Sequence, residues 1–395
     1  MNQRIIIQSL IFLVLVGCQS QKTPPKKAVA PDAAAQPEPK PAKKDTDPFS
    51  EFRNNAEQRL KRLEGYVIRD ASDSENPWAL AHGILAFGPN LKATNGRLAI
   101  DVMVEDYAKL ETKGSKKSVN FPARTQKDHP VEPHNNLIAS SLLQAGVVQT
   151  KTFKLKSGET ISMKDLVERV SEEAVIPETP KQWHDFAWTY SALLHAGAKP
   201  KGETSKNLAL NALNYIETQQ AFLTELMRKG QPDKVVKKKQ FIYAHTCGGL
   251  HMIQASLFGA SLVKDPKVIE RAQTQLETIL FRWKAERSIY RNMKRQYPMY
   301  SLLLQAQELK FYGHLLETLS LSQRIGIYPI NDNSRAIVKG IIQDLVSTID
   351  DLAVNYLDLE SVKNVKKQVY YDLIGDGCHA IRGLRESLMA FFPRK

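Results

Sequence analysis

WHDFAWTYSALLHAG, residues 183–197, is one of a set of segments that decide the fold. Its apolar side chains recur three and four residues apart, which predicts a helix with a buried face. A histidine stands near its start, and a glycine preceded by alanine closes it. The question is whether this arrangement is local or is repeated along the chain.

The histidine and its apolar run recur in five further places, and three of these segments also end in a glycine preceded by alanine or phenylalanine. In each of the five places a histidine opens an apolar helical run or lies near its start. The repeated positions are His82, His134, His184, His245, His314 and His379. Successive histidines are 52, 50, 61, 69 and 65 residues apart, which leaves room for two helices and two loops in each interval. Six such helical hairpins could close into a ring.

The rest of the chain is also predominantly helical in pattern. Apolar residues three and four apart predict long helices at 208–227, 268–283, 302–321 and 337–357. One alternating segment predicts at most one short β-hairpin near residues 150–160. It runs into Ser162 and Asp165, which predict a capping box at the next helix start. The expected fold class is therefore all-α, built from helical hairpins.

This repeat resembles the α/α-toroid, the six-hairpin barrel of many glycan-active enzymes, prenyltransferases and lanthionine cyclases. The resemblance would span residues 50–395. It implies inner helices that alternate with outer ones, so that the same end of each inner helix lines one central cleft. An open helical solenoid and an irregular all-α domain are the alternatives.

The N-terminus carries a separate signal. A basic Arg4 precedes a mostly apolar stretch at 5–16, which is too short to cross a bilayer and is typical of a signal peptide. It ends in Leu15-Val16-Gly17-Cys18. These four residues resemble the bacterial lipobox, which implies cleavage after residue 17 and acylation of Cys18, palmitate included. Gln19 follows where an Asp would resemble an inner-membrane retention signal, so the outer membrane facing the periplasm is the expected location.

Residues 18–47 are predicted to be a lipidated, disordered tether, because prolines, lysines and alanines leave almost nothing to bury. The single all-α domain is then expected at 48–395. The full chain has a formal charge of +13, and most of it lies on that domain. In an envelope compartment nucleic acid is an unexpected partner, whereas anionic glycan, peptidoglycan or lipid headgroups suit such a charge. A basic surface that serves only solubility is the alternative.

The candidate cleft residues are the repeated histidines and the polar residues beside them. They are His82, His134, Asn135, His184, Asp185, His245 and His379. Asn135 could instead cap a helix. Asp185, Asp372 and Asp376 could place carboxylates in one cleft for glycoside hydrolysis, which needs two of them.

The two cysteines of the domain leave three readings open. Cys247 and Cys378 could form a disulfide in an oxidising compartment, or remain buried thiols. They could also bind zinc, since Cys247 and His251 would share a helix face and Cys378 with His379 would complete a tetrahedral set. Lanthionine cyclases, which the repeat resembles, bind zinc through one Cys and a later Cys-His pair. The 131-residue separation departs from that family, so the expectation is no cofactor, with zinc as the alternative.

Two classes of function fit these residues. The first is a lipid-anchored envelope lipoprotein that binds or scaffolds an envelope component through a His-lined cleft or a basic surface. The second is a glycan-active enzyme, a polysaccharide lyase or a glycoside hydrolase. P-loop, GxGxxG, GxSxG and HExxH patterns are not found in the sequence, which disfavours nucleotide enzymes, common serine hydrolases and zincins. No catalytic motif is complete, so the binding protein is preferred.

Overall fold

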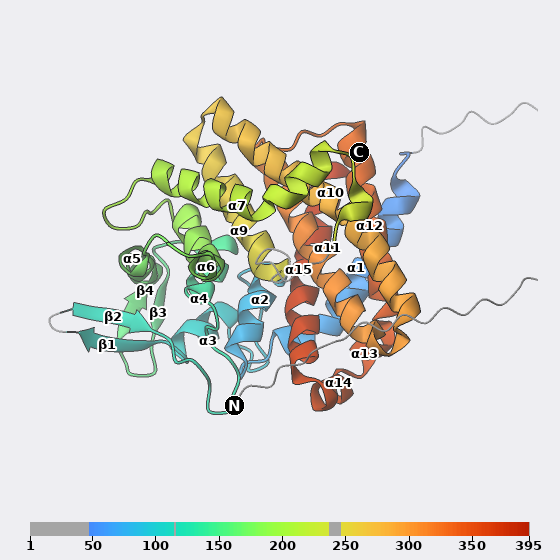
Figure 1. The fold of residues 1–395 in the computed structure, drawn as a ribbon. Coiled ribbons are helices and arrows are strands. Elements are labelled where there is room, and N and C mark those ends of the chain that lie inside the picture. The colour runs from blue at the N-terminus through green and yellow to red at the C-terminus, as the bar shows by residue number, and fades with distance from the viewer. Residues whose placement is uncertain (1–46, 114–115, 237–245, 395) are drawn as a thin grey trace, which may run out of the picture. The chain divides into compact units, whose positions relative to one another are not determined.

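The computed structural model describes residues 47–113, 116–236 and 246–394 (Figure 1). The signal peptide, Cys18 and nearly all of the tether lie outside these residues. Within them the fold is all-α, as predicted, with only two short antiparallel strand pairs. None of the described helices is both long enough and apolar enough to span a membrane.

Six helices contact one another in a closed cycle. Helix α2 packs on α4, α4 on α6, α6 on α9, α9 on α11, α11 on α15, and α15 returns to α2. These six helices are α2 (Pro77–Phe87), α4 (Leu137–Gln144), α6 (Pro180–Ala196), α9 (Thr246–Val263), α11 (Ser301–Arg324) and α15 (Lys367–Phe391). They come from the segments that the histidine repeat marks, so the repeat corresponds to one closed set of neighbours.

Other helices pack against this cycle. Helix α1 contacts α15, α5 contacts α6, α7 and α10 contact α9, and α12 contacts α11. The bounds of these helices are α1 (Ser50–Ala71), α5 (Met163–Glu173), α7 (Ser205–Arg228), α10 (Pro266–Gln296) and α12 (Asp332–Asp351). The short helices are α3 (Ala99–Glu105), α13 (Ala353–Leu357) and α14 (Leu359–Val365), with single 3-10 turns η1 (Pro232–Lys234) and η2 (Pro298–Tyr300).

Local sequence signals explain several helix boundaries. The predicted capping box is present at α5, where Ser162 and Asp165 exchange hydrogen bonds. A second capping box joins Thr179 and Gln182 at the start of α6, and Gly197 ends that helix with a φ of 65°. Three of the four predicted long helices are confirmed as α7, α10 and α11. The fourth stops at Asp351, and α13 is a separate short helix.

The strands differ from the prediction in one respect. The predicted hairpin is confirmed as β3 (Thr152–Lys154) paired with β4 (Thr160–Ser162). A second hairpin joins β1 (Lys109–Lys113) to β2 (Lys116–Asn120), and the sequence did not predict it. Only Leu110 and Val119, which lie opposite each other, are aliphatic in these lysine-rich strands, so the alternation was too weak to read.

Helices α11 and α15 approach each other more closely than ordinary side chains permit. A Cβ added to Gly313 would lie 2.8 Å from the backbone nitrogen of Ala380. A Cβ added to Gly383 would overlap the carbonyl oxygen of Gly313 and lie 3.0 Å from the nitrogen of Glu317. Glycine is required at such points because no other residue lets two backbones come this close. This contact places the histidines of α11 and α15 side by side.

Candidate functional site

The histidines of the cycle form one connected group of rings. His314 and His379 have ring centroids 3.9 Å apart, and His251 lies 4.8 Å from the first and 5.0 Å from the second. His82 lies 5.4 Å from His379. On the other side, Trp188 bridges the group to His134, because its ring lies 5.1 Å from His251 and stacks on His134 at 3.8 Å. His184 lies 6.4 Å from His134 and completes the row.

His245 was the expected member of this row from the fourth segment, and it lies outside the described residues. His251, six positions later and within α9, contributes the ring instead. The sequence predicted His251 only as a metal ligand and assigned the repeat position to His245. Residue spacing could not separate these two histidines, since both precede or lie within the same apolar run.

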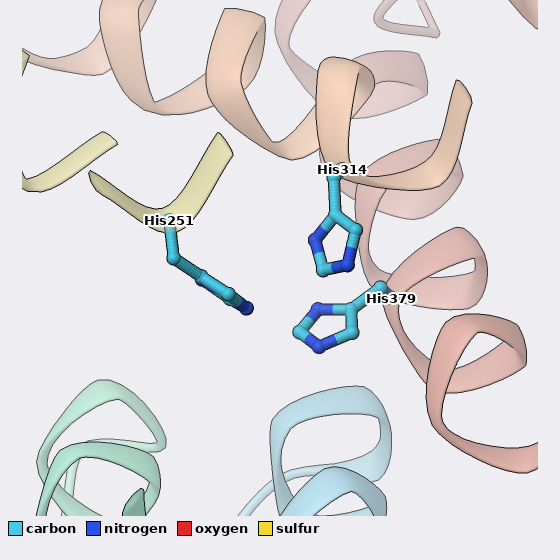
Figure 2. A group of neighbouring side chains, drawn as sticks. All are labelled: His251, His314 and His379. Atoms are coloured by element: carbon cyan, nitrogen blue, oxygen red, sulfur yellow. The ribbon is translucent and has the colours of Figure 1, made fainter. Parts of the chain in front are cut away.

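The deepest part of the group consists of His251, His314 and His379. The three side chains are almost fully buried. Figure 2 shows their rings pointing toward one another from three different helices, α9, α11 and α15. One potential ligand atom from each lies within 4.8 Å of the other two. The three histidines could therefore hold a metal ion.

Glu317 orients two of these rings. Its carboxylate oxygens lie 2.9 and 3.0 Å from Nδ1 of His379, and one of them lies 3.3 Å from Nδ1 of His314. Because an ionised carboxylate only accepts hydrogen bonds, both Nδ1 atoms must donate. The Nε2 atoms of neutral rings then carry their lone pairs. His379 Nε2 is buried and makes no hydrogen bond to the described residues.

Burial sets the charge state of the group. It lowers the pKa of His82 to about 3, with the positive charge of His379 as a further cause. Burial, followed by the neighbouring His314 and His379, also holds the pKa of His251 well below its usual value. Burial opposes ionisation of Glu317, but His379 and the two histidine hydrogen bonds outweigh it and hold the Glu317 pKa well below its usual range. Burial thus favours the neutral forms of His82 and His251, while Glu317 stays ionised beside them.

A cavity of about 800 Å³ lies next to this cluster. Its wall combines aromatic rings, histidines, carboxylates and amines from helices that are distant in sequence. The wall residues include Trp78, His82, His134, His184, Trp188, Lys310, Tyr371, Asp372 and Asp376. Of the predicted cleft residues, His82, His134 and His184 border this cavity. His379 was also predicted there but does not line it, and instead contacts His82.

Two carboxylates and one amine form the charged part of the wall. Lys310 Nζ lies 3.4 Å from an oxygen of Asp372 and 3.4 Å from an oxygen of Asp376. These two oxygens are therefore no more than about 7 Å apart, which is a separation that glycoside hydrolysis can use. Burial and the charge of Asp376 raise the pKa of Asp372. Burial would also raise the pKa of Asp376, but Lys310 and His314 lower it.

Asn135 and Asp185 border a different cavity. It has a volume of about 320 Å³ and is also lined by Asn136 and Thr189. The alternative role of Asn135 as a helix cap is wrong as well, since the cap position of α4 belongs to Asn136. Asn136 makes no side-chain cap and instead donates a hydrogen bond to Thr189 Oγ1 at 3.0 Å. It ties α4 to α6, which is a packing role.

The cysteine predictions fare differently. Cys378 is a fully buried free thiol in the hydrophobic core. The side chain of Cys247, its predicted disulfide partner, lies outside the described residues, so the bridge stays a prediction. Burial, and then Glu317 and Asp376, raise the pKa of Cys378 and so favour its protonated form. Of the predicted metal ligands, His251 and His379 meet in space, and His314 joins them in place of a cysteine.

Sequence reasoning missed several residues of the site. Glu317 and Lys310 belong to none of the predicted motifs, since their contacts to α15 form only across two packed helices. Trp78 and Trp188 did carry a readable signal, because each lies four residues from a repeated histidine and so shares its helix face. No protein-family model matches the chain, and no significant match was found among curated proteins or solved structures.

Proposed function

We propose that this protein is a lipid-anchored lipoprotein of the bacterial cell envelope whose all-α domain binds a glycan, with peptidoglycan as the candidate ligand. The observation that carries this proposal is the 800 Å³ cavity. Pyranose rings present apolar C–H faces and many hydroxyls, so they suit a wall of aromatic rings and charged side chains. We also propose that the closed cycle of six helices is an α/α-toroid, the architecture in which such clefts are common.

The charges of the cavity refine the ligand class. Lys310 is paired with Asp372 and Asp376, while Arg124 and Lys367 contact Asp128 at 3.0 and 3.3 Å. The basic side chains of the wall are therefore largely compensated. A hydroxyl-rich ligand of low net charge fits this wall better than a polyanion, although the domain as a whole is basic.

A bulky side chain in the cavity should block glycan binding. Gln307 borders the cavity from α11 and is partly exposed. Gln307→Trp should lower affinity for purified peptidoglycan about tenfold or more, equivalent to about 1.4 kcal/mol, because the indole takes up ligand space. Sedimentation of the detergent-solubilised protein with sacculi measures this. Gln58→Trp on the exposed face of α1 is the matched control and should bind as the wild type does.

Equal binding by the wild type and Gln307→Trp would reject the cavity as the glycan site. The same mixtures test the second candidate function, glycoside hydrolysis, which is favoured by the short separation of Asp372 and Asp376. Release of soluble sugar fragments from the sacculi by the wild type would make the protein an enzyme. Binding without release would leave it a glycan-binding lipoprotein.

The lipid anchor has its own test. Cys18→Ser should abolish palmitate labelling and move the protein from the membrane fraction to the soluble fraction, since acylation needs the thiol. Several acyl chains give stable anchoring where one is marginal, so the shift should be nearly complete. Cys247→Ser is the matched control and should keep both label and membrane location. Membrane retention of Cys18→Ser would count against the anchor.

A further inference from the structure

We propose that His251, His314 and His379 bind one divalent transition-metal ion, zinc being the best match, at the inner end of the cavity. This proposal does not depend on glycan binding. It rests on the geometry of three side chains from three helices of the cycle, reinforced by Glu317 and Asp376.

The first support is convergence. Each of the three imidazoles offers one potential ligand atom, and these three atoms lie within 4.8 Å of one another. All three side chains are almost fully buried. Zinc binds imidazole nitrogens at about 2.0–2.1 Å in tetrahedral sites, so the three nitrogens would draw closer to one another around one ion. Three nitrogens with one further position is also a ligand set that distinguishes zinc-like ions from magnesium or calcium, which require oxygen.

The second support is the position of Glu317. It accepts hydrogen bonds from Nδ1 of His379 and Nδ1 of His314, so a ligand would meet the Nε2 side of His379, while Nε2 of His314 faces Asp376. Metal-bound histidines commonly donate their other ring N–H to a carboxylate in this way. His379 Nε2 is buried and makes no hydrogen bond to the described residues. In a purely structural network, a buried polar atom of this kind would normally have a partner. A bound cation would satisfy that nitrogen.

The third support is the fourth position. Asp376 borders the cavity, and its Oδ1 lies 3.7 Å from Nε2 of His314. A carboxylate at this place supplies an anionic oxygen to an ion held by the three imidazoles, either directly or through a water molecule. Since Asp376 also faces the cavity, the ion would lie within reach of a molecule bound there. Glu317, by contrast, acts as a positioning residue on the opposite side of the rings.

Metal content of the full-length lipoprotein in detergent tests the proposal. After removal of metals by chelation and dialysis against Zn²⁺, the wild type should retain about one zinc ion per chain by mass spectrometry. Co²⁺ should give the intense visible absorption of a tetrahedral site. Wild-type protein that retains no zinc and shows no such absorption would overturn the proposal, and this outcome needs no variant to fold.

Variants assign the ligands. His251→Gln and His379→Ala should lose the stoichiometric zinc, whereas His195→Ala, which changes an exposed histidine outside the cluster, should retain it. Glu317→Gln should keep the Co²⁺ absorption but weaken Zn²⁺ affinity about 10- to 100-fold, as expected for a positioning residue. Unchanged zinc binding in folded His379→Ala would place the ion elsewhere and overturn the assignment. Failure of peptidoglycan binding alone would leave this result unaffected.

Discussion

Gly383→Val should destabilise the protein by about 3 kcal/mol or more, because the new side chain must enter the backbone of α11. A Cβ at position 383 already overlaps the carbonyl oxygen of Gly313, and Glu317 N and Leu316 Cβ lie 3.0 Å away. Backbone atoms cannot move aside as a flexible side chain can, so α11 and α15 must separate. Urea unfolding followed by circular dichroism measures this loss. The urea concentration at the unfolding midpoint should fall, while the dependence of the unfolding free energy on urea concentration should stay unchanged.

The same substitution at Gly65 is the control. Gly65 lies in α1, and a Cβ added there meets nothing within 4 Å. Gly65→Val should change stability by no more than about 0.5 kcal/mol, since valine is a slightly better helix former than glycine. If Gly383→Val were as stable as Gly65→Val, the close approach of α11 and α15 would be wrong. The pairing of His314 with His379 would then lose its structural basis.

Much of the helical architecture could be predicted from periodicity. Amphipathic spacing gave the helices α7, α10 and α11, and the Ser162–Asp165 capping box gave the start of α5. These features depend on residues within one turn of each other, and such local relations are readable in a linear sequence. The histidine repeat went further, because it marked the helices that contact one another in the closed cycle.

The composition of the buried cluster could not be predicted in the same way. Glu317 stands three residues after His314, where it would ordinarily be read as a surface residue, but it is buried because α15 covers that face of α11. Its partner His379 lies 62 residues away. Similarly, Lys310 joins Asp372 and Asp376 only because the two helices pack closely. Contacts of this kind depend on tertiary packing, which a single sequence does not encode by spacing.

The cysteines show a second limit of composition. Two cysteines in a chain expected in an oxidising compartment favour a disulfide on compositional grounds. Cys378 nevertheless lies one residue before His379 on α15 and is wholly buried in the hydrophobic core. Free cysteine behaves as a small apolar side chain in such surroundings. The burial of an individual cysteine is thus a property that composition cannot reveal.

The second large effect is expected at the buried ion pair of α10. Arg282 and Glu286 are almost completely inaccessible, lie four residues apart and are in direct contact. The Arg282 guanidinium also lies 5.0 Å over the ring of Phe311 on α11. Glu286→Leu should cost about 3–5 kcal/mol in unfolding free energy, because it removes the carboxylate that contacts this buried cation. That is a large fraction of the stability of a typical domain, so the unfolding midpoint should fall steeply.

Replacing both partners separates the two contributions. Desolvation of two charges offsets most of their attraction, so Arg282→Met combined with Glu286→Leu should recover most of the stability that Glu286→Leu loses. Glu225 and Lys229 are the matched comparison, since they form an exposed pair with the same spacing at 2.8 Å. Glu225→Leu should have little measurable effect because solvent screens that pair. A double variant as unstable as Glu286→Leu would contradict this expectation. It would mean that the fold needs the two charges themselves and that apolar side chains of similar volume cannot replace them.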